Sequence, residues 1–347
     1  MKILIVGPSW VGDMVMSQSL YKTLKQLHPS ALIDVLAPAW CKPILERMPE
    51  VHKAIEMPLG HGEFNFLGRM ALGRELKHQG YTHAFILANS AKTALIPWFA
   101  GIPIRTGWKG EMRYGLLTDL RKNKKNFQYM VERYLALAHP KESMQDSLSL
   151  GGLNTLPKPK LNIDSVTQNL TIKKFDLNLN TATIGLCPGA EFGPAKQWPP
   201  EHYAVVASQL ISQGYQIWIF RSKNDIHTAI TIKNLVDKKH QNSVYILAGK
   251  TSLIEAVDLL GACYIVISND SGLMHVAAAV DCKVVGIYGS TSPEYTPPLT
   301  EKVSIVHTNI ECRPCFKREC PLGHLKCLKE LDPQLVLNTI ATSNLDK

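Results

Sequence analysis

The sequence lacks an apolar run long enough to cross a membrane. Its longest apolar patch, residues 94–104, contains two prolines and falls well short of the ~20 residues that a spanning helix needs. The apolar run 2–6 ends at Gly7 and Pro8 and is too short for the core of a signal peptide. We therefore expect a cytoplasmic protein that at most makes peripheral contact with the inner face of the cytoplasmic membrane.

The signatures of the common cofactors are also missing. Residues 7–14 nearly match the spacing of a phosphate-binding P-loop, but Asp13 and Met14 stand where lysine and serine or threonine would be. The same turn is not Gly-x-Gly-x-x-Gly, so the nicotinamide fingerprint is absent. The sequence contains neither a His-Glu-x-x-His zinc motif nor an RNA-recognition signature. We expect no cofactor, no catalytic metal and no nucleic-acid partner, with a nucleotide- or nucleic-acid-binding module as the non-enzymatic alternative.

Acidic side chains are outnumbered by basic ones. Among 347 residues, 38 Lys and Arg stand against 29 Asp and Glu, which gives a formal net charge of +9. This excess favours an anionic partner, such as a nucleotide, a phosphorylated glycan, a nucleic acid or an acidic membrane surface. A basic tract at 109–125 is the candidate for contact with an anionic inner-membrane surface, and a solvated loop is the alternative. Its cationic members are Lys109, Arg113, Arg121, Lys122, Lys124 and Lys125.

Strand and helix patterns alternate along both halves of the chain. Strands are predicted at 2–6, 31–37, 81–87, 104–107, 183–189, 216–220, 244–247, 264–269 and 283–289. Helices are predicted at 14–28, 90–100, 129–138, 200–213, 226–240 and 252–261, and another begins near residue 271. The weakly periodic stretch 151–181, which is rich in Pro, Asn and Lys, is the best linker candidate. This pattern predicts an α/β protein with two Rossmann-like, doubly wound domains that face a central cleft.

The chain is organised around residues 264–279, where a buried strand leads through Ser-Asn-Asp-Ser-Gly into an alanine-rich helix. Ligands collect at the carboxyl ends of parallel strands. The free N–H groups of the first helical turn, and the helix dipole, would receive a phosphate there. The alternative is that Asp270 or Ser271 only caps the helix.

Two other polar loops contain candidate catalytic residues. Asp13 lies in a glycine-rich turn at a helix start, where a carboxylate could serve as a general base or could simply cap the helix. Lys196 follows a strand and precedes a helix, in a loop that spans residues 188–199. It could neutralise a diphosphate, or it could be an ordinary surface charge. Loops 249–253 and 289–293 are expected at the same sheet edge.

Four of the eight cysteines cluster near the C-terminus, with His324 among them. Such a cluster could hold a structural zinc ion, although the last Cys-x6-Cys spacing departs from short zinc knuckles. Reduced structural thiols and one or two disulfides are the alternatives, and a cytoplasmic location disfavours disulfides. We favour reduced thiols. The cluster consists of Cys312, Cys315, Cys320 and Cys327.

Three segments taken together, 7–17, 188–199 and 268–278, resemble the bacterial ADP-heptose:lipopolysaccharide heptosyltransferases in order and spacing. The resemblance covers essentially the whole chain. The cysteine-rich segment 312–327 fits the heptosyltransferase II subtype. The resemblance implies a GT-B fold and an inverting, metal-independent transfer of heptose. The donor would be ADP-L-glycero-β-D-manno-heptose, and the acceptor would be the first heptose of the inner core on Kdo2-lipid A. Heptosyltransferase I and another sugar-nucleotide enzyme of this fold, such as an epimerase, are the alternatives.

The resemblance also implies roles for individual residues. Asp13 would be the general base, and Lys196 would stabilise the diphosphate leaving group. Asp225 is a weaker candidate for a ribose contact, and Ala190-Glu191 stand where relatives often have Thr-Thr. The implied substrate-binding residues are Gly12, Glu191, Thr251, Asp270, Ser271, Gly272 and His275.

The same resemblance implies what each part of the chain does. Residues 1–165 would bind the acceptor, and residues 166–330 would bind the ADP-sugar. Residues 331–347 would form a C-terminal helix or tail that can cross back to the first domain.

Overall fold

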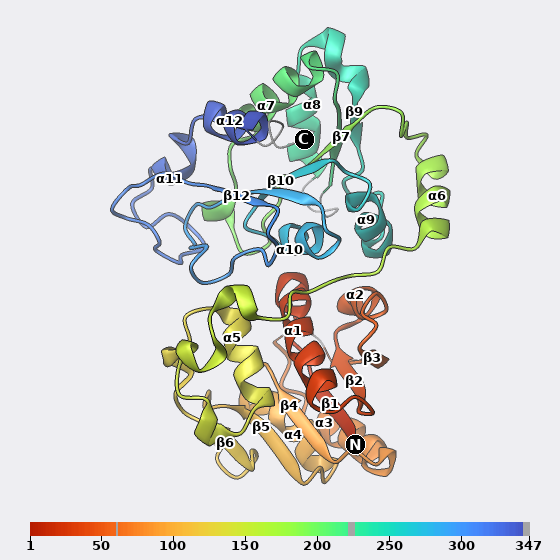
Figure 1. Cartoon of the computed structure of the whole chain (residues 1–347), viewed down its shortest axis with the longest axis vertical. Coiled ribbons are helices and arrows are strands. Elements are labelled where there is room, and N and C mark those ends of the chain that lie inside the picture. Colours follow the sequence, from red (N-terminus) through yellow and green to blue (C-terminus); the bar gives the residue numbers. More distant parts are fainter. Residues whose placement is uncertain (60–61, 221–225, 343–347) are drawn as a thin grey trace. The chain divides into compact units, whose positions relative to one another are not determined.

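The computed structural model describes residues 1–59, 62–220 and 226–342. The chain divides into two compact units, with the boundary between Pro159 and Lys160 (Figure 1). No helix in these described ranges is long and apolar enough to cross a membrane.

The first unit contains a six-stranded parallel sheet with the order β3-β2-β1-β4-β5-β6. Its strands are β1 (Lys2–Val6), β2 (Leu32–Ala37), β3 (Val51–Glu56), β4 (His83–Ile86), β5 (Ile104–Trp108) and β6 (Asp119–Arg121). Its α-helices are α1 (Val11–Leu27), α2 (Lys42–Leu45), α3 (Phe66–Leu76), α4 (Ala91–Phe99) and α5 (Met130–Leu135). Residues 3–6 of the central strand β1 are large apolar side chains that are fully buried, as expected for a parallel strand covered on both faces.

The second unit contains another six-stranded parallel sheet, with the order β12-β11-β10-β7-β8-β9. Its strands are β7 (Thr183–Cys187), β8 (Gln216–Ile219), β9 (Val244–Ile246), β10 (Ile265–Asn269), β11 (Lys283–Ile287) and β12 (Val303–Val306). Its α-helices are α6 (Ser165–Lys174), α7 (Pro200–Ser212), α8 (Ile226–Leu235), α9 (Leu253–Leu260), α10 (Gly272–Ala279), α11 (Lys326–Lys329) and α12 (Pro333–Thr342). The C-terminal helix α12 packs against α7, and its Val336 is fully buried in the core of this unit.

Both sheets have the Rossmann strand order. Numbered along the first unit the order is 3-2-1-4-5-6, and the second sheet gives the same order when it is read from its other edge. The predicted α/β class with two doubly wound sheets is confirmed. In each sheet the strand order reverses between the first and fourth strands, which are β1 and β4 in one unit and β7 and β10 in the other. Ligands of this fold bind outside the carboxyl ends of the strands at that reversal.

Several local predictions were wrong. The expected linker 151–181 contains helix α6, which begins after Asp164, whose carboxylate accepts hydrogen bonds from the N–H groups of Val166 and Thr167. The helix expected over 14–28 begins at Val11, and the one expected over 226–240 ends at Leu235. The prediction also missed α3 and the strands β3, β6 and β12.

Candidate functional site

The loops that follow β7 and β10 bring Lys196 and Asp270 together at the reversal point of the second sheet. Lys196 ends a short 3-10 turn, Pro194–Lys196, in the loop after β7. Asp270 is the first residue after β10. The two strands are paired neighbours, so loops that are 74 positions apart in sequence meet at one edge of the sheet.

Asp270 is held by two short polar contacts. The Lys196 Nζ donates to Asp270 Oδ2 at 2.6 Å, and the hydroxyl of Thr291 donates to the same oxygen at 2.6 Å. The side chains of Asp270 and Lys196 are only 4% and 14% exposed. The pair therefore lies largely out of water, where the loss of either charge would leave the other without compensation.

Asn269 fixes the two loops against each other. Its side-chain amide donates to the carbonyl oxygen of Pro188 at 2.7 Å. Its Oδ1 accepts from the N–H of Trp198 at 3.2 Å and from the hydroxyl of Tyr203 at 3.0 Å. Because Pro188 and Trp198 lie near the two ends of the loop that contains Lys196, one fully buried amide anchors the whole loop.

Helix α10 presents its first turn beside this pair. Ser271 is the N-cap residue, but no side chain caps the helix, and the Ser271 hydroxyl lies 3.2 Å from that of Ser268. The interpretation that Asp270 or Ser271 only caps the helix is therefore wrong. Gly272 is the first helical residue, so no Cβ stands at the start of the helix. Uncapped N–H groups at a helix start can bind an anion.

His275 lies one turn into α10 and is 5% exposed. Burial lowers its pKa to about 4; the nearby Asp270 acts in the opposite direction and Lys196 in the same direction as burial. His275 is therefore neutral near pH 7 and belongs to the cluster around Lys196 and Asp270.

The other expected substrate-binding residues are Thr251, Glu191 and Gly12, with Asp225 as the weaker candidate for a ribose contact. Thr251 lies in the turn between β9 and α9, where its hydroxyl donates to the carbonyl of Leu247 at 3.4 Å. Glu191 is exposed in the loop that contains Lys196. Gly12 is buried in the first turn of α1, in the other unit. Asp225 lies outside the described residues.

Two residues that matter to this cluster, Thr291 and Asn269, were not singled out from the sequence. Both lie in loops or motifs that had been expected at this sheet edge. Their role depends on hydrogen bonds between distant segments, which periodicity does not reveal.

In the first unit, Asp13 is the third residue of α1 and is partly exposed. The N-cap position belongs to Trp10, and Asp13 is the acidic residue of the first helical turn. The charge of Asp13 affects the pKa of two neighbouring side chains. Burial raises the pKa of Cys41 to about 12, with Asp13 adding to the shift. Burial lowers the pKa of Lys124 to about 8, and Asp13 partly offsets that decrease.

Lys124 belongs to a small group of cations near Asp13. Arg133 and Arg113 both contribute to the lowered pKa of Lys124. Helix α5, which contains Arg133, packs against α1, which contains Asp13. Lys124 therefore lies within electrostatic reach of Asp13 and of two other cations.

The basic tract 109–125 does not form a continuous exposed surface. Arg113 is only 1% exposed, and its guanidinium donates to the backbone carbonyls of Ala88 and Trp108. Lys109, Lys122 and Lys125 remain exposed.

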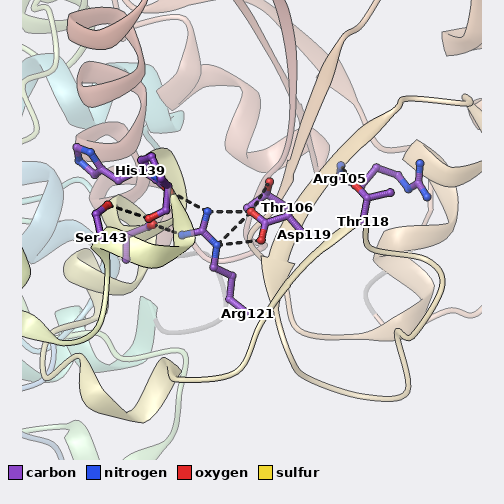
Figure 2. Close-up of polar contacts among 9 residues, drawn as sticks. Arg105, Thr106, Thr118, Asp119, Arg121, His139 and Ser143 are labelled. Carbon is purple, nitrogen blue, oxygen red and sulfur yellow. Dashed lines mark hydrogen bonds and ion pairs between the residues drawn. The ribbon is translucent and has the colours of Figure 1, made fainter.

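Arg121 is equally buried, at 3% exposed. Figure 2 shows its guanidinium between Asp119 and the segment around His139. It donates to Asp119 Oδ2 at 2.8 Å, to the carbonyl of Ala136 at 2.7 Å and to that of His139 at 2.8 Å. Thr106 adds a 3.2 Å hydrogen bond to the same carboxylate. Arg121 therefore ties β6 to the segment after α5 and is not available to a membrane surface.

All eight cysteines are free thiols, and Cys312, Cys315 and Cys320 lie near Cys327. Burial and the neighbouring Cys312, Cys320 and Cys315 raise the pKa of Cys327. Backbone N–H groups, that of Leu325 foremost, lower the pKa of Cys320. Within residues 1–59, 62–220 and 226–342, no group of three or more His, Cys, Asp or Glu is arranged to hold a metal ion.

Comparison with known proteins relates this geometry to a family. Over 341 residues the chain is 48% identical to lipopolysaccharide heptosyltransferase 2 of Escherichia coli (strain K12), covering 98% of this chain and 97% of the relative. It is 48% identical to lipooligosaccharide heptosyltransferase 2 of Haemophilus influenzae, covering 98% of each. The structure of E. coli ADP-heptose lps heptosyltransferase II superposes with a TM-score of 0.89 at 46% identity, covering 100% of this chain and 99% of the other.

The family model described as glycosyltransferase family 9 (heptosyltransferase) matches residues 69–326, a range that includes both Lys196 and Asp270. This match spans more than half of the chain, and it agrees with the fold and with relatives that align almost end to end. The chain therefore belongs to glycosyltransferase family 9, the heptosyltransferases.

Proposed function

We propose that this enzyme transfers L-glycero-D-manno-heptose from ADP-heptose to the first heptose of the lipopolysaccharide inner core. The observation that carries the proposal on the donor side is the cluster of Lys196, Asp270 and the uncapped start of α10 at the carboxyl ends of β7 and β10. The 48% identity to lipopolysaccharide heptosyltransferase 2 over nearly the full length of the chain supports the choice of sugar and acceptor.

The donor side can stabilise a leaving diphosphate without a metal ion. Departure of ADP leaves negative charge on the phosphate that was bonded to the sugar. A lysine and backbone N–H groups fixed in advance stabilise such charge at little reorganisation cost. Lys196 and the first turn of α10 provide both kinds of group at one edge of the sheet.

Asp13 acts as the general base in the proposed reaction. The acceptor hydroxyl loses its proton to the Asp13 carboxylate as its oxygen attacks C1 of the heptose, and the bond between C1 and the ADP oxygen breaks. A single displacement of this kind inverts the anomeric configuration, so a β-linked donor gives an α-linked product. A carboxylate suits this proton transfer because it can be held within hydrogen-bond reach of the hydroxyl.

The acceptor is anionic and lipid-linked, so the excess of positive charge would favour its binding. The exposed lysines of the tract, Lys109, Lys122 and Lys125, are the members that remain available for an anionic inner-membrane surface. The enzyme is proposed to work in the cytoplasm, with only peripheral membrane contact.

The test is transfer to defined cores. Purified enzyme is incubated with ADP-heptose and with Kdo2-lipid A that carries either no heptose or one heptose, and products are followed by mass spectrometry. We expect one heptose to be added to the core that already has one, with an α linkage by NMR. Transfer to the heptose-free core would instead indicate heptosyltransferase I activity. Conversion of the nucleotide sugar without any transfer would indicate an epimerase.

A further inference from the structure

The cysteine-rich segment 312–327 is built onto the loops of the donor site. The N–H of Ala195 donates to the carbonyl of Arg318 at 3.0 Å. The N–H of Phe316 donates to the carbonyl of Ser290 at 2.7 Å. The guanidinium of Arg313 donates to the carbonyls of Gly289 and Thr291, each at 3.1 Å. The segment therefore contacts both the residue before Lys196 and the loop that contains Thr291.

Gly193 allows residue 318 to approach the loop that contains Lys196. Its φ is +150°, and a Cβ at this position would meet the Arg318 carbonyl oxygen at 2.5 Å and the Arg318 Cβ at 3.1 Å. A larger residue would be strained there and would also push Arg318 away. The absence of a side chain at Gly193 thus leaves room for the backbone of Arg318 beside this loop.

The ring of Phe192 contacts two cations. The Lys196 Nζ is 5.0 Å from the centre of its ring, and the Arg318 Cζ is 5.4 Å from the same centre. Cations within about 6 Å of an aromatic centroid are attracted to the ring. The guanidinium of Arg318 and the ammonium of Lys196 are therefore held at the same aromatic ring.

The two cations differ in how their charge is balanced. Lys196 is paired with Asp270 at 2.6 Å. Arg318 is exposed, and it makes no ion pair with any carboxylate in the described part of the chain. A diphosphate that approaches this edge meets a lysine whose charge is already matched by a carboxylate. The unbalanced positive charge next to it comes from Arg318.

We propose that Arg318 is a second phosphate-binding residue of the donor site, contributed by the cysteine-rich segment. This inference rests on the proposed function, because it takes the diphosphate of an ADP-sugar as the ligand. A guanidinium suits the task, since its planar fork can hold two phosphate oxygens at once and it stays charged at any physiological pH. Stacking on Phe192 orients the fork before the donor arrives.

The experiment compares Arg318→Ala with Lys317→Ala. The two residues are exposed, adjacent and equally charged. Of the two, it is Arg318 whose guanidinium lies over the ring of Phe192. Affinities for ADP and for adenosine are measured by calorimetry on the full chain. We expect Arg318→Ala to weaken ADP binding about 10-fold or more, with adenosine affinity unchanged. Lys317→Ala should bind both ligands like the wild type, and Arg318→Lys should fall in between.

A second variant separates loss of the charge from loss of packing. Arg318→Gln keeps a polar stem over Phe192 without the charge, and it should show the same selective loss of ADP affinity. ADP affinity in Arg318→Ala and Arg318→Gln within twofold of that in Lys317→Ala would overturn the inference and leave the proposed function standing. Failure of the wild-type protein to bind ADP would overturn both.

Discussion

Replacing Lys196 and replacing Asp270 should change protein stability and ADP affinity in different orders. Replacing Lys196 with Met removes the partner of a carboxylate that is only 4% exposed. Removing one member of a buried pair costs about 3–5 kcal/mol, since the remaining charge is left without compensation. Asp270→Asn leaves the lysine, which is 14% exposed and better able to reach water, so its cost should be smaller, about 1–3 kcal/mol. The double variant has no unpaired charge and should lie within about 1 kcal/mol of the wild type.

ADP affinity should follow a different order. Lys196→Met loses a charge-assisted phosphate contact of about 1.5–3 kcal/mol, or roughly 10- to 150-fold in affinity. The double variant should bind ADP equally weakly although its stability has returned. Asp270→Asn should bind ADP at least as tightly as the wild type, because the charge of Lys196 is no longer neutralised.

Two measurements on the same four proteins test this reasoning. Native-state hydrogen exchange in peptides from β7 and β10 reports the local free energy of opening. Calorimetric titration reports ADP affinity. The reasoning is refuted if Asp270→Asn loses as much ADP affinity as Lys196→Met, since the pair would then act only as a structural unit.

The remaining predictions concern the base, the buried histidine and metals. Asp13→Asn should abolish turnover in the transfer assay while ADP affinity stays within twofold of the wild type. Near-normal turnover would rule out Asp13 as the general base. The free energy of unfolding should fall by at most about 3 kcal/mol as the pH drops from about 6.5 to about 4. In this range His275 takes up its proton in the unfolded state but not in the folded state. His275→Gln should flatten this part of the pH–stability profile, and an unchanged slope would contradict the assignment. Turnover should survive treatment with EDTA, and a loss restored by added Mg²⁺ would show that catalysis needs a metal. Elemental analysis should find no stoichiometric zinc if Cys312, Cys315, Cys320 and Cys327 are structural thiols.

The central strands and their helices could be predicted because their own residues determine them. The β10–α10 unit combines a continuous buried apolar strand with an alanine-rich helix. Edge strands carry a weaker signal. In β3 no residue is fully buried, and β6 has only three residues. Helix α6 was missed because Thr171 is its only buried residue, so it has almost no apolar periodicity.

The site could be predicted in its parts but not in its contacts. The sequence placed Lys196 and Asp270 in polar loops after strands, where ligands of this fold bind. Their ion pair depends on which strands are neighbours, which local patterns do not determine. The burial of two cations in the basic tract could not be predicted for a related reason. Arg113 and Arg121 are buried because distant backbone carbonyls accept from them, and nothing in the spacing of the cations indicates this.

The most direct test of the central claim is the crystal structure of this enzyme with ADP bound. We predict that the diphosphate lies at the carboxyl ends of β7 and β10, within hydrogen-bond distance of Lys196 Nζ and of the first N–H groups of α10. ADP bound elsewhere, with the Lys196–Asp270 pair untouched, would contradict the assignment of this sheet edge as the donor site.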